Sequence, residues 1–268
     1  GVCREIRELS LPDCPAGQSV VWKVDLQDIP QVSGEQILEF LFVEKSPAHA
    51  GCGLSGWKQF LWKKGCHPAL VTEKVTAHFS KQGTLLVGEM GDLTLRLDTE
   101  TGALQVDNVS GVLLHDLFFT PFRAPTDNDA HSPLVLGKQN WFTKQYDHPK
   151  RTCLEVRQGN GVEEPSLTYT TAYQTEKDSF YVTVGLWQAG QNRIFIDCNV
   201  QSPADMLSPG RIGMTAILPV RFTAMKWYGK GPLETYPDRQ CGGRMGEISR
   251  FIYGLRNTDF IRNLVVCD

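Results

Sequence analysis

The sequence predicts an all-β protein whose antiparallel sheets pack face to face. Residues 91–98 alternate apolar and polar side chains, so that Leu93, Leu95 and Leu97 share one face. A turn at 99–102 then leads into a returning strand at 103–106, which is the pattern of a β-hairpin. The apolar spacing in the 268 residues indicates no helix of convincing length. These observations favour a sandwich of twisted sheets.

Residues 1–63 predict a small β unit. Its apolar runs are interrupted by turn residues, and they indicate strands at 19–26, 37–43 and 57–62. Three strands make a poor core by themselves, so we expect this unit to be part of a sandwich. Residues 64–75 are typical of a linker, and we expect residues 76–268 to form a second β domain.

In the second domain, three β-branched runs predict an antiparallel meander with strands at 167–173, 180–187 and 193–200. An apolar run at 112–119 predicts a strand that leads into a polar loop. The stretch 130–150 is polar with interleaved aromatics and is compatible with a short helix or a long loop.

The loop after residue 122 gathers polar side chains at one stiff point. Pro125 fixes its own φ, and Asp127, Asn128 and Asp129 favour turns beside Arg123. Acceptor-rich side chains next to a guanidinium suit the binding of hydroxyl groups, as on a sugar. They equally suit the clamping of a loop through side-chain-to-backbone hydrogen bonds.

Composition excludes several classes of partner. Apolar content is 41%, charged content is 21% and the net charge is −3, so nothing indicates nucleic acid or an anionic membrane as a partner. No apolar run approaches a membrane span. The chain begins with Gly1 and shows no signal peptide, so we expect that a preceding segment is missing. Eight scattered cysteines permit disulfides but fit free thiols and a cytoplasmic location better.

The loop described above has the sequence RAPTDND at 123–129, and a second motif, WYGKGPLETYPDR, follows at 227–239. The two strings, in this order and spacing, resemble segments of the lac-type β-galactosidases of glycoside hydrolase family 2. The resemblance implies that residues 1–63 are the second half of an immunoglobulin-like sandwich. It implies that residues 76–268 are a galactose-mutarotase-like supersandwich, the small-chain domain. The likeness ends after about residue 248, which implies a truncated domain.

In the enzymes that this chain resembles, the two catalytic glutamates and the magnesium ligands lie on a (β/α)₈ barrel. No such barrel is visible in this sequence. The resemblance therefore implies no catalytic residue, metal ligand or cofactor in this chain. It implies a non-catalytic C-terminal portion of a β-galactosidase homologue that supports carbohydrate binding and domain assembly. The partners it implies are a β-galactoside or other carbohydrate and a barrel-containing β-galactosidase chain.

The candidate residues for carbohydrate binding or loop anchoring come from the two motifs and the stretch between them: Arg123, Asp127, Asn128, Asp129, Trp141, Trp227, Tyr228, Glu234, Tyr236, Asp238 and Arg239. The acidic members could line a pocket or could pair with the arginines between loops. The aromatic members could stack on sugar rings or could belong to the core.

Two other functions are compatible with the sequence. One is a free-standing carbohydrate-binding sandwich. The other is an aldose-epimerase activity, which would need a histidine and a carboxylate at the anomeric centre, such as His131 or His148 with Glu234.

Overall fold

The structure is a computed structural model, and it describes residues 6–29, 34–44, 53–64, 77–123, 146–176, 178–206, 209–231, 235 and 239–251. Within these ranges the regular structure is β-strand, apart from one 3₁₀ turn, η1 (Gln240–Gly242). The predicted all-β class is confirmed. No helix of the described ranges has the length and apolar character needed to cross a membrane.

The described residues fall into two compact units. The first takes in residues from Gly1–Ala69 and Thr223–Tyr253, and the second takes in residues from Leu70–Phe222. The expected linker at 64–75 lies almost entirely outside the described residues. The predicted domain boundaries therefore stay a prediction.

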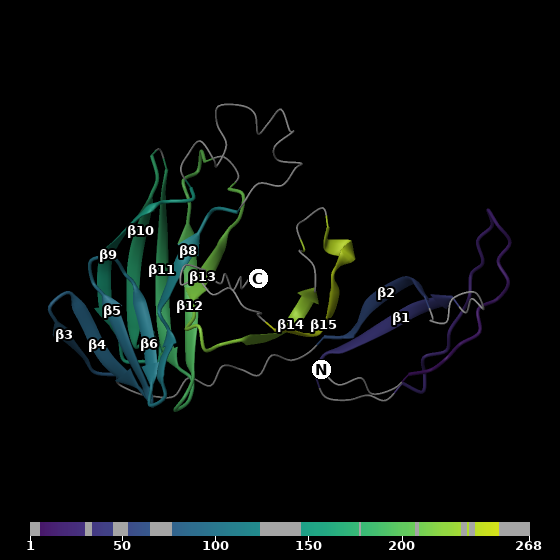
Figure 1. Ribbon diagram of the computed structural model, residues 1–268, viewed down its shortest axis with the longest axis horizontal. Helices are drawn as coiled ribbons and strands as arrows, with labels where there is room; N and C mark the ends of the chain where they lie inside the picture. Colours follow the sequence, from purple (N-terminus) through teal and green to yellow (C-terminus); the bar gives the residue numbers. More distant parts are fainter. Residues whose placement is uncertain are drawn as a thin grey trace. The chain divides into compact units, whose positions relative to one another are not determined.

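The second unit begins with a five-stranded antiparallel sheet (Figure 1), whose strands lie in chain order as β3 (Phe79–Gln82), β4 (Leu85–Met90), β5 (Leu93–Asp98), β6 (Leu104–Asn108) and β7 (Gly111–Leu114). The predicted hairpin is the pair β5–β6. Leu93, Leu95 and Leu97 are buried and the residues between them are half-buried, as the alternation requires.

A four-stranded antiparallel sheet follows, with strands β9 (Lys150–Gln158), β10 (Leu167–Gln174), β11 (Ser179–Gln188) and β12 (Ile194–Gln201) in the order β12-β11-β10-β9. The predicted meander of three strands is confirmed as β10, β11 and β12. The sequence did not predict β9. Its charged and exposed side chains are typical of an edge strand and hide the apolar alternation.

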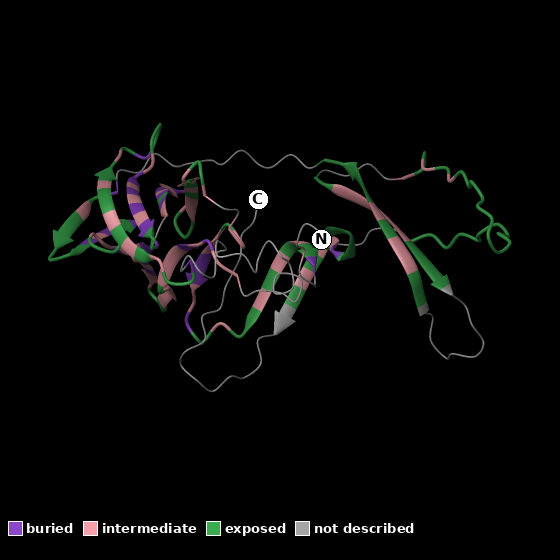
Figure 2. Ribbon diagram, turned by 90° about the horizontal axis from the view of Figure 1, so that it is seen from above, coloured by how far each residue is buried: buried purple, intermediate pink, exposed green. Residues whose placement is uncertain are grey.

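One apolar core joins these two sheets. Leu95, Leu97 and Leu104 of the first sheet and Leu167, Phe180 and Leu186 of the second are completely buried in it. Figure 2 shows the buried residues concentrated on these strands. The predicted face-to-face packing is thus the arrangement that removes both apolar faces from water.

The apolar run 112–119 forms two strands instead of the single strand we expected. It breaks at His115, after which β8 (Asp116–Thr120) leaves the five-stranded sheet and pairs with β13 (Gly213–Ile217). The backbone N–H of His115 donates to Ile217 O at 2.8 Å. The Asp116 carboxylate accepts the backbone N–H groups of Leu104, at 3.2 Å, and Leu117, at 2.8 Å. These bonds fix the break between the two apolar runs.

The first unit holds two antiparallel hairpins, β1 (Gln36–Glu44) with β2 (Gly53–Lys63) and β14 (Ala224–Gly231) with β15 (Arg244–Phe251). The strands predicted at 37–43 and 57–62 are confirmed as β1 and β2. The strand predicted at 19–26 is wrong, because the chain there is irregular. Val21 is 91% exposed and Val20 46%, and no described strand pairs with this stretch, so its alternation does not form a strand.

Candidate functional site

Arg123 lies three residues after β8 ends at Thr120, where the pairing of β8 with β13 stops. Phe119 is buried in the core, and the hydroxyl groups of Thr120 and Thr215 lie 2.6 Å apart across the pair. Just beyond the pair, Arg123 donates its Nε–H to Gly210 O at 2.9 Å. The guanidinium that begins the RAPTDND motif is therefore attached to the strand pair through a backbone carbonyl.

A second guanidinium, that of Arg211, belongs to neither sequence motif and follows Gly210 directly. Arg211 is half-buried, and its Nε and Nη2 atoms are buried without a hydrogen-bond partner among the residues that the structure describes. Buried donors that lack an acceptor are unfavourable, so such a group favours an incoming oxygen ligand. No spacing in the sequence could have identified Arg211, because its proximity to Arg123 comes from the antiparallel pairing of β8 with β13.

Seven of the candidate residues lie outside the described residues: Asp127, Asn128, Asp129, Trp141, Glu234, Tyr236 and Asp238. His131 of the epimerase alternative lies outside them too. Their predicted roles stay predictions. His148 is described, and its imidazole is 87% exposed, with Nε2 3.4 Å from the Asp147 carboxylate.

Trp227 and Tyr228 occupy adjacent positions on β14, opposite Ile248 and Glu247 of β15. Trp227 is half-buried and donates its indole N–H to Lys230 O at 3.4 Å. Tyr228 is 52% exposed, and its hydroxyl donates to the Glu35 carboxylate at 2.5 Å. This hydrogen bond, followed by desolvation and the Glu35 charge, raises the pKa of Tyr228 to about 12.

Close packing favours glycine at position 231 of this motif. A Cβ on Gly231 would lie 2.3 Å from Ile248 Cδ1 and 3.3 Å from Trp227 Cζ2. The missing side chain lets the Trp227 ring approach the backbone of β14. Arg239 comes after the motif's prolines, exposed and directly before η1.

A polar network that the sequence did not reveal joins the two hairpins of the first unit. Arg244 donates to the Glu39 carboxylate from Nε at 2.8 Å and from Nη2 at 2.7 Å. Gln59 donates to Glu39 at 2.9 Å and exchanges hydrogen bonds with the backbone of Met245 at 3.0 and 2.7 Å. The Arg244 guanidinium also lies over the Trp57 ring, 5.8 Å from its centroid. The network positions β15 against β1 and β2.

These contacts position strands and loops of the described residues. In the part of the chain that the structure describes, no cluster of three or more His, Cys, Asp or Glu side chains could hold a metal ion. Of the candidates, Trp227 and Tyr228 are consecutive on β14, so their side chains point to opposite faces of the hairpin. Arg123 belongs to the other compact unit.

Comparison with known proteins agrees with the resemblance in the two motifs. A β-galactosidase of Priestia megaterium is 26% identical over 185 residues, which cover 68% of this chain and 17% of that protein. β-Galactosidases of Yersinia pestis bv. Antiqua (strain Angola) and Yersinia pseudotuberculosis serotype O:3 are 26% identical over 134 residues, covering 47% of this chain and 13% of each. The chain thus spans less than a fifth of the length of these relatives.

A protein family described as the β-galactosidase small chain matches residues 89–252. The matched region holds both motifs, most of the two-sheet sandwich and the hairpin β14–β15. It covers more than half of the 268 residues. The chain therefore belongs to the β-galactosidase small-chain family.

Proposed function

We propose that this chain is a non-catalytic C-terminal portion of a β-galactosidase homologue that contributes carbohydrate binding and domain assembly. The observation that carries the proposal is the small-chain match over residues 89–252, in relatives named β-galactosidase. The parent activity would be hydrolysis of terminal β-D-galactosyl groups. A glycosidase of this kind needs two carboxylates that flank the scissile bond, and in this proposal another part of the assembly supplies them.

Two described features support carbohydrate binding. In the described part of the chain, Nε and Nη2 of Arg211 are buried without an acceptor, and Arg211 directly follows Gly210, whose carbonyl accepts from Arg123. A sugar hydroxyl is an acceptor that such donors can bind. On β14, Tyr228 presents an exposed ring whose hydroxyl is held by Glu35. A ring fixed in this way loses little side-chain entropy when a sugar stacks on it.

The first experiment is hydrolysis of a chromogenic β-galactoside by the purified 268-residue chain, with and without magnesium. We expect no turnover, because the catalytic glutamates and metal ligands are supplied elsewhere. Turnover that is lost in Asp127→Asn or Glu234→Gln would contradict the proposal, because the two motifs would then form an active site themselves.

The second experiment is a titration of the chain with galactose and with lactose, followed by tryptophan fluorescence. We expect saturable binding with two components, one weakened several-fold in Arg211→Met and the other weakened several-fold in Tyr228→Ala. Tyr181→Ala is the matched control, because Tyr181 is an exposed tyrosine, at 43%, on β11 of the meander. Equal losses in all three variants would show that the binding is not at these positions.

Domain assembly calls for a third test. We expect the chain to bind a β-galactosidase that lacks its small-chain region and to restore galactoside hydrolysis to it. Failure to associate at micromolar concentrations would remove this part of the proposal. We also place the chain in the cytoplasm, a location supported by the free thiols of Cys14, Cys153, Cys198 and Cys241.

A further inference from the structure

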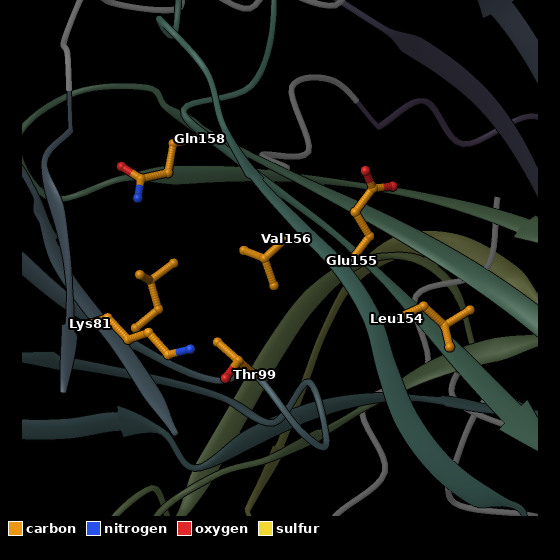
Figure 3. A pocket seen from close by; sticks show the side chains of 7 residues that line it. Lys81, Thr99, Leu154, Glu155, Val156 and Gln158 are labelled. Atoms are coloured by element: carbon orange, nitrogen blue, oxygen red, sulfur yellow. The ribbon is translucent and has the colours of Figure 1, made fainter. Parts of the chain in front are cut away.

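A cavity of about 370 Å³ lies beside the outer edge of β9, and Figure 3 shows the side chains around it. Its lining comes from both sheets of the second unit. The five-stranded sheet and its β5–β6 turn contribute Lys81, Leu86 and Thr99; the strand β9 contributes Leu154, Glu155, Val156 and Gln158.

The backbone of β9 has N–H and C=O groups on the side of this cavity. Among the described strands β9 pairs with β10 alone and is therefore an edge strand. Gly159 N–H donates to Ser166 O at 3.1 Å, and the register pairs Gln158 with Leu167 and Val156 with Tyr169. Hydrogen-bonded and non-hydrogen-bonded pairs alternate along an antiparallel ladder. The N–H and C=O groups of Val156 and Gln158 therefore point away from β10, toward the open edge.

Two contacts close the ends of this open edge. At one end, the backbone N–H of Cys153 donates to Glu100 O at 2.7 Å. At the other end, the side-chain Nε2 of Gln158 donates to Phe79 O at 3.4 Å. Between Cys153 and Gln158 the strand runs about 16 Å at 3.3 Å per residue. This length suits an added strand of three to five residues, by the same spacing.

The side chains beside the edge define what such a strand would carry. Leu86, only 7% exposed, and the half-buried Val156 form an apolar floor, and Leu154 next to them is 55% exposed. Lys81 is exposed and makes no ion pair among the described residues. The Glu155 carboxylate is already held by Arg157 at 2.6 and 2.8 Å, and in Figure 3 it points away from Lys81. The unmatched charge at the cavity is therefore positive.

We propose that the edge of β9 between Leu154 and Gln158 binds an extended acidic segment of a partner polypeptide by strand addition. The segment's backbone bonds to Val156 and Gln158, one apolar side chain packs on Leu86 and Val156, and a carboxylate pairs with Lys81. Backbone hydrogen bonds supply the affinity of such a complex, and the alternate side chains supply its specificity. This proposal uses none of the residues of the proposed sugar-binding features, so either proposal can fail without the other.

The test uses the ¹⁵N-labelled 268-residue chain and the peptide acetyl-Thr-Val-Asp-Val-Thr-amide. We expect the amide resonances of Val156 and Gln158 to shift in a saturable way. A peptide with lysine in place of aspartate should bind several-fold more weakly, and Lys81→Glu should reverse this preference. Lys150→Gln is the matched control, because Lys150 lies on β9 but does not line the cavity.

The backbone hydrogen bonds between β9 and the peptide are tested by changing the protein and by changing the peptide. Val156→Pro removes an N–H that faces the open edge and leaves the ladder to β10 intact, since proline is tolerated at such edge positions. We expect this variant to unfold at nearly the wild-type urea concentration and to bind the peptide at least about tenfold more weakly. Should it fail to fold, N-methylation of the peptide tests the same bonds. Methylation of the residues whose N–H groups face β9 should abolish binding, and methylation of the alternate residues, whose N–H groups face away, should leave binding unchanged.

Three results would overturn the proposal. The first is peptide binding that is indifferent to Lys81→Glu and to N-methylation. The second is sodium acetate shifting the same resonances as strongly as the peptide, which would make the cavity a small-anion site. The third is self-association of the chain that disappears in Val156→Pro, which would make a second copy the occupant.

Discussion

Arg151 Nη1 lies 3.0 Å from Asp116 Oδ1 and 2.8 Å from Asp116 Oδ2, so one guanidinium nitrogen contacts both oxygens of a carboxylate 35 residues away. Arg151 also donates to the carbonyls of Leu117, at 3.0 Å, and Gly102, and its guanidinium lies over the Tyr173 ring. The side chains are only 14% and 21% exposed. The pair joins β9 to the point where the run 112–119 breaks into two strands.

Removing one member of this pair should destabilise the fold strongly. We expect Arg151→Met and Asp116→Asn each to lower the free energy of unfolding by about 3 kcal/mol, because the remaining partner stays buried without its counter-charge. Urea unfolding measures the change. Arg157→Ala is the control, since the exposed Arg157–Glu155 pair also lies on β9 and its loss should not shift the midpoint resolvably. Equal midpoints for Arg151→Met and Arg157→Ala would contradict this account.

Alanine substitutions at Gly91 and Gly83 distinguish the cost of backbone strain from the cost of a steric clash. Both have positive φ, 63° and 64°. A Cβ on Gly91 would lie 2.2 Å from the backbone oxygen of Gln191, which accepts the N–H of Asp92 at 2.7 Å, whereas Gly83 has open space. We expect Gly83→Ala to cost about 1 kcal/mol for the left-handed backbone. Gly91→Ala should cost at least about 2 kcal/mol more, by the range for overpacked sites.

The comparison is made by urea unfolding of the two variants side by side. A Gly91→Ala protein as stable as Gly83→Ala would mean that the loop holding Gln191 moves away without cost. The contact between the β4–β5 turn and the β11–β12 connection would then contribute nothing to stability.

Glu35 should control the ionisation of Tyr228. Because the pKa of Tyr228 is raised to about 12 in the folded chain, we expect Glu35→Gln to lower it toward the ordinary value of 10. The raised pKa favours the neutral phenol in the folded state. Its stabilisation is present below pH 10 and is lost as the pH rises from 10 toward 12.

Absorbance titration of tyrosinate in the wild-type chain, Glu35→Gln and Tyr228→Phe measures this ionisation. Burial also raises the pKa of Tyr146, Tyr169 and Tyr173, so the Tyr228→Phe chain should lose the contribution of one tyrosine from the late-titrating component and keep the rest. An unchanged titration curve in Glu35→Gln would rule out the hydrogen bond between Tyr228 and Glu35 in solution.

The described cysteines should differ in reactivity. Burial, and secondarily the charge of Asp197, raises the pKa of Cys198 to about 11, while Cys14 is exposed. The thiolate is the reactive form, so at pH 8 we expect iodoacetamide to modify Cys14 well before Cys198. The rate at Cys198 should rise with pH toward 11. Peptide mapping by mass spectrometry follows both sites, and equal rates at pH 8 would contradict the burial of Cys198.

The sequence by itself determined the all-β class, the hairpin at 91–106, the meander at 167–200 and the family. Each of these rests on local periodicity or on contiguous motifs, which a chain expresses without reference to distant residues. Leu93, Leu95 and Leu97 are one example, because their alternation specifies both a strand and its buried face.

Only the tertiary structure decided the features that depend on which strands become neighbours. The alternation at 19–26 has the local pattern of a strand but no partner among the described strands, while the charged strand β9 is formed because β10 pairs with it. The break at His115, the placement of Arg211 next to Arg123 and the bond from Tyr228 to Glu35 join residues that are distant in sequence or depend on the pairing of distant strands. Such contacts arise from sheet pairing and packing, which no local pattern encodes.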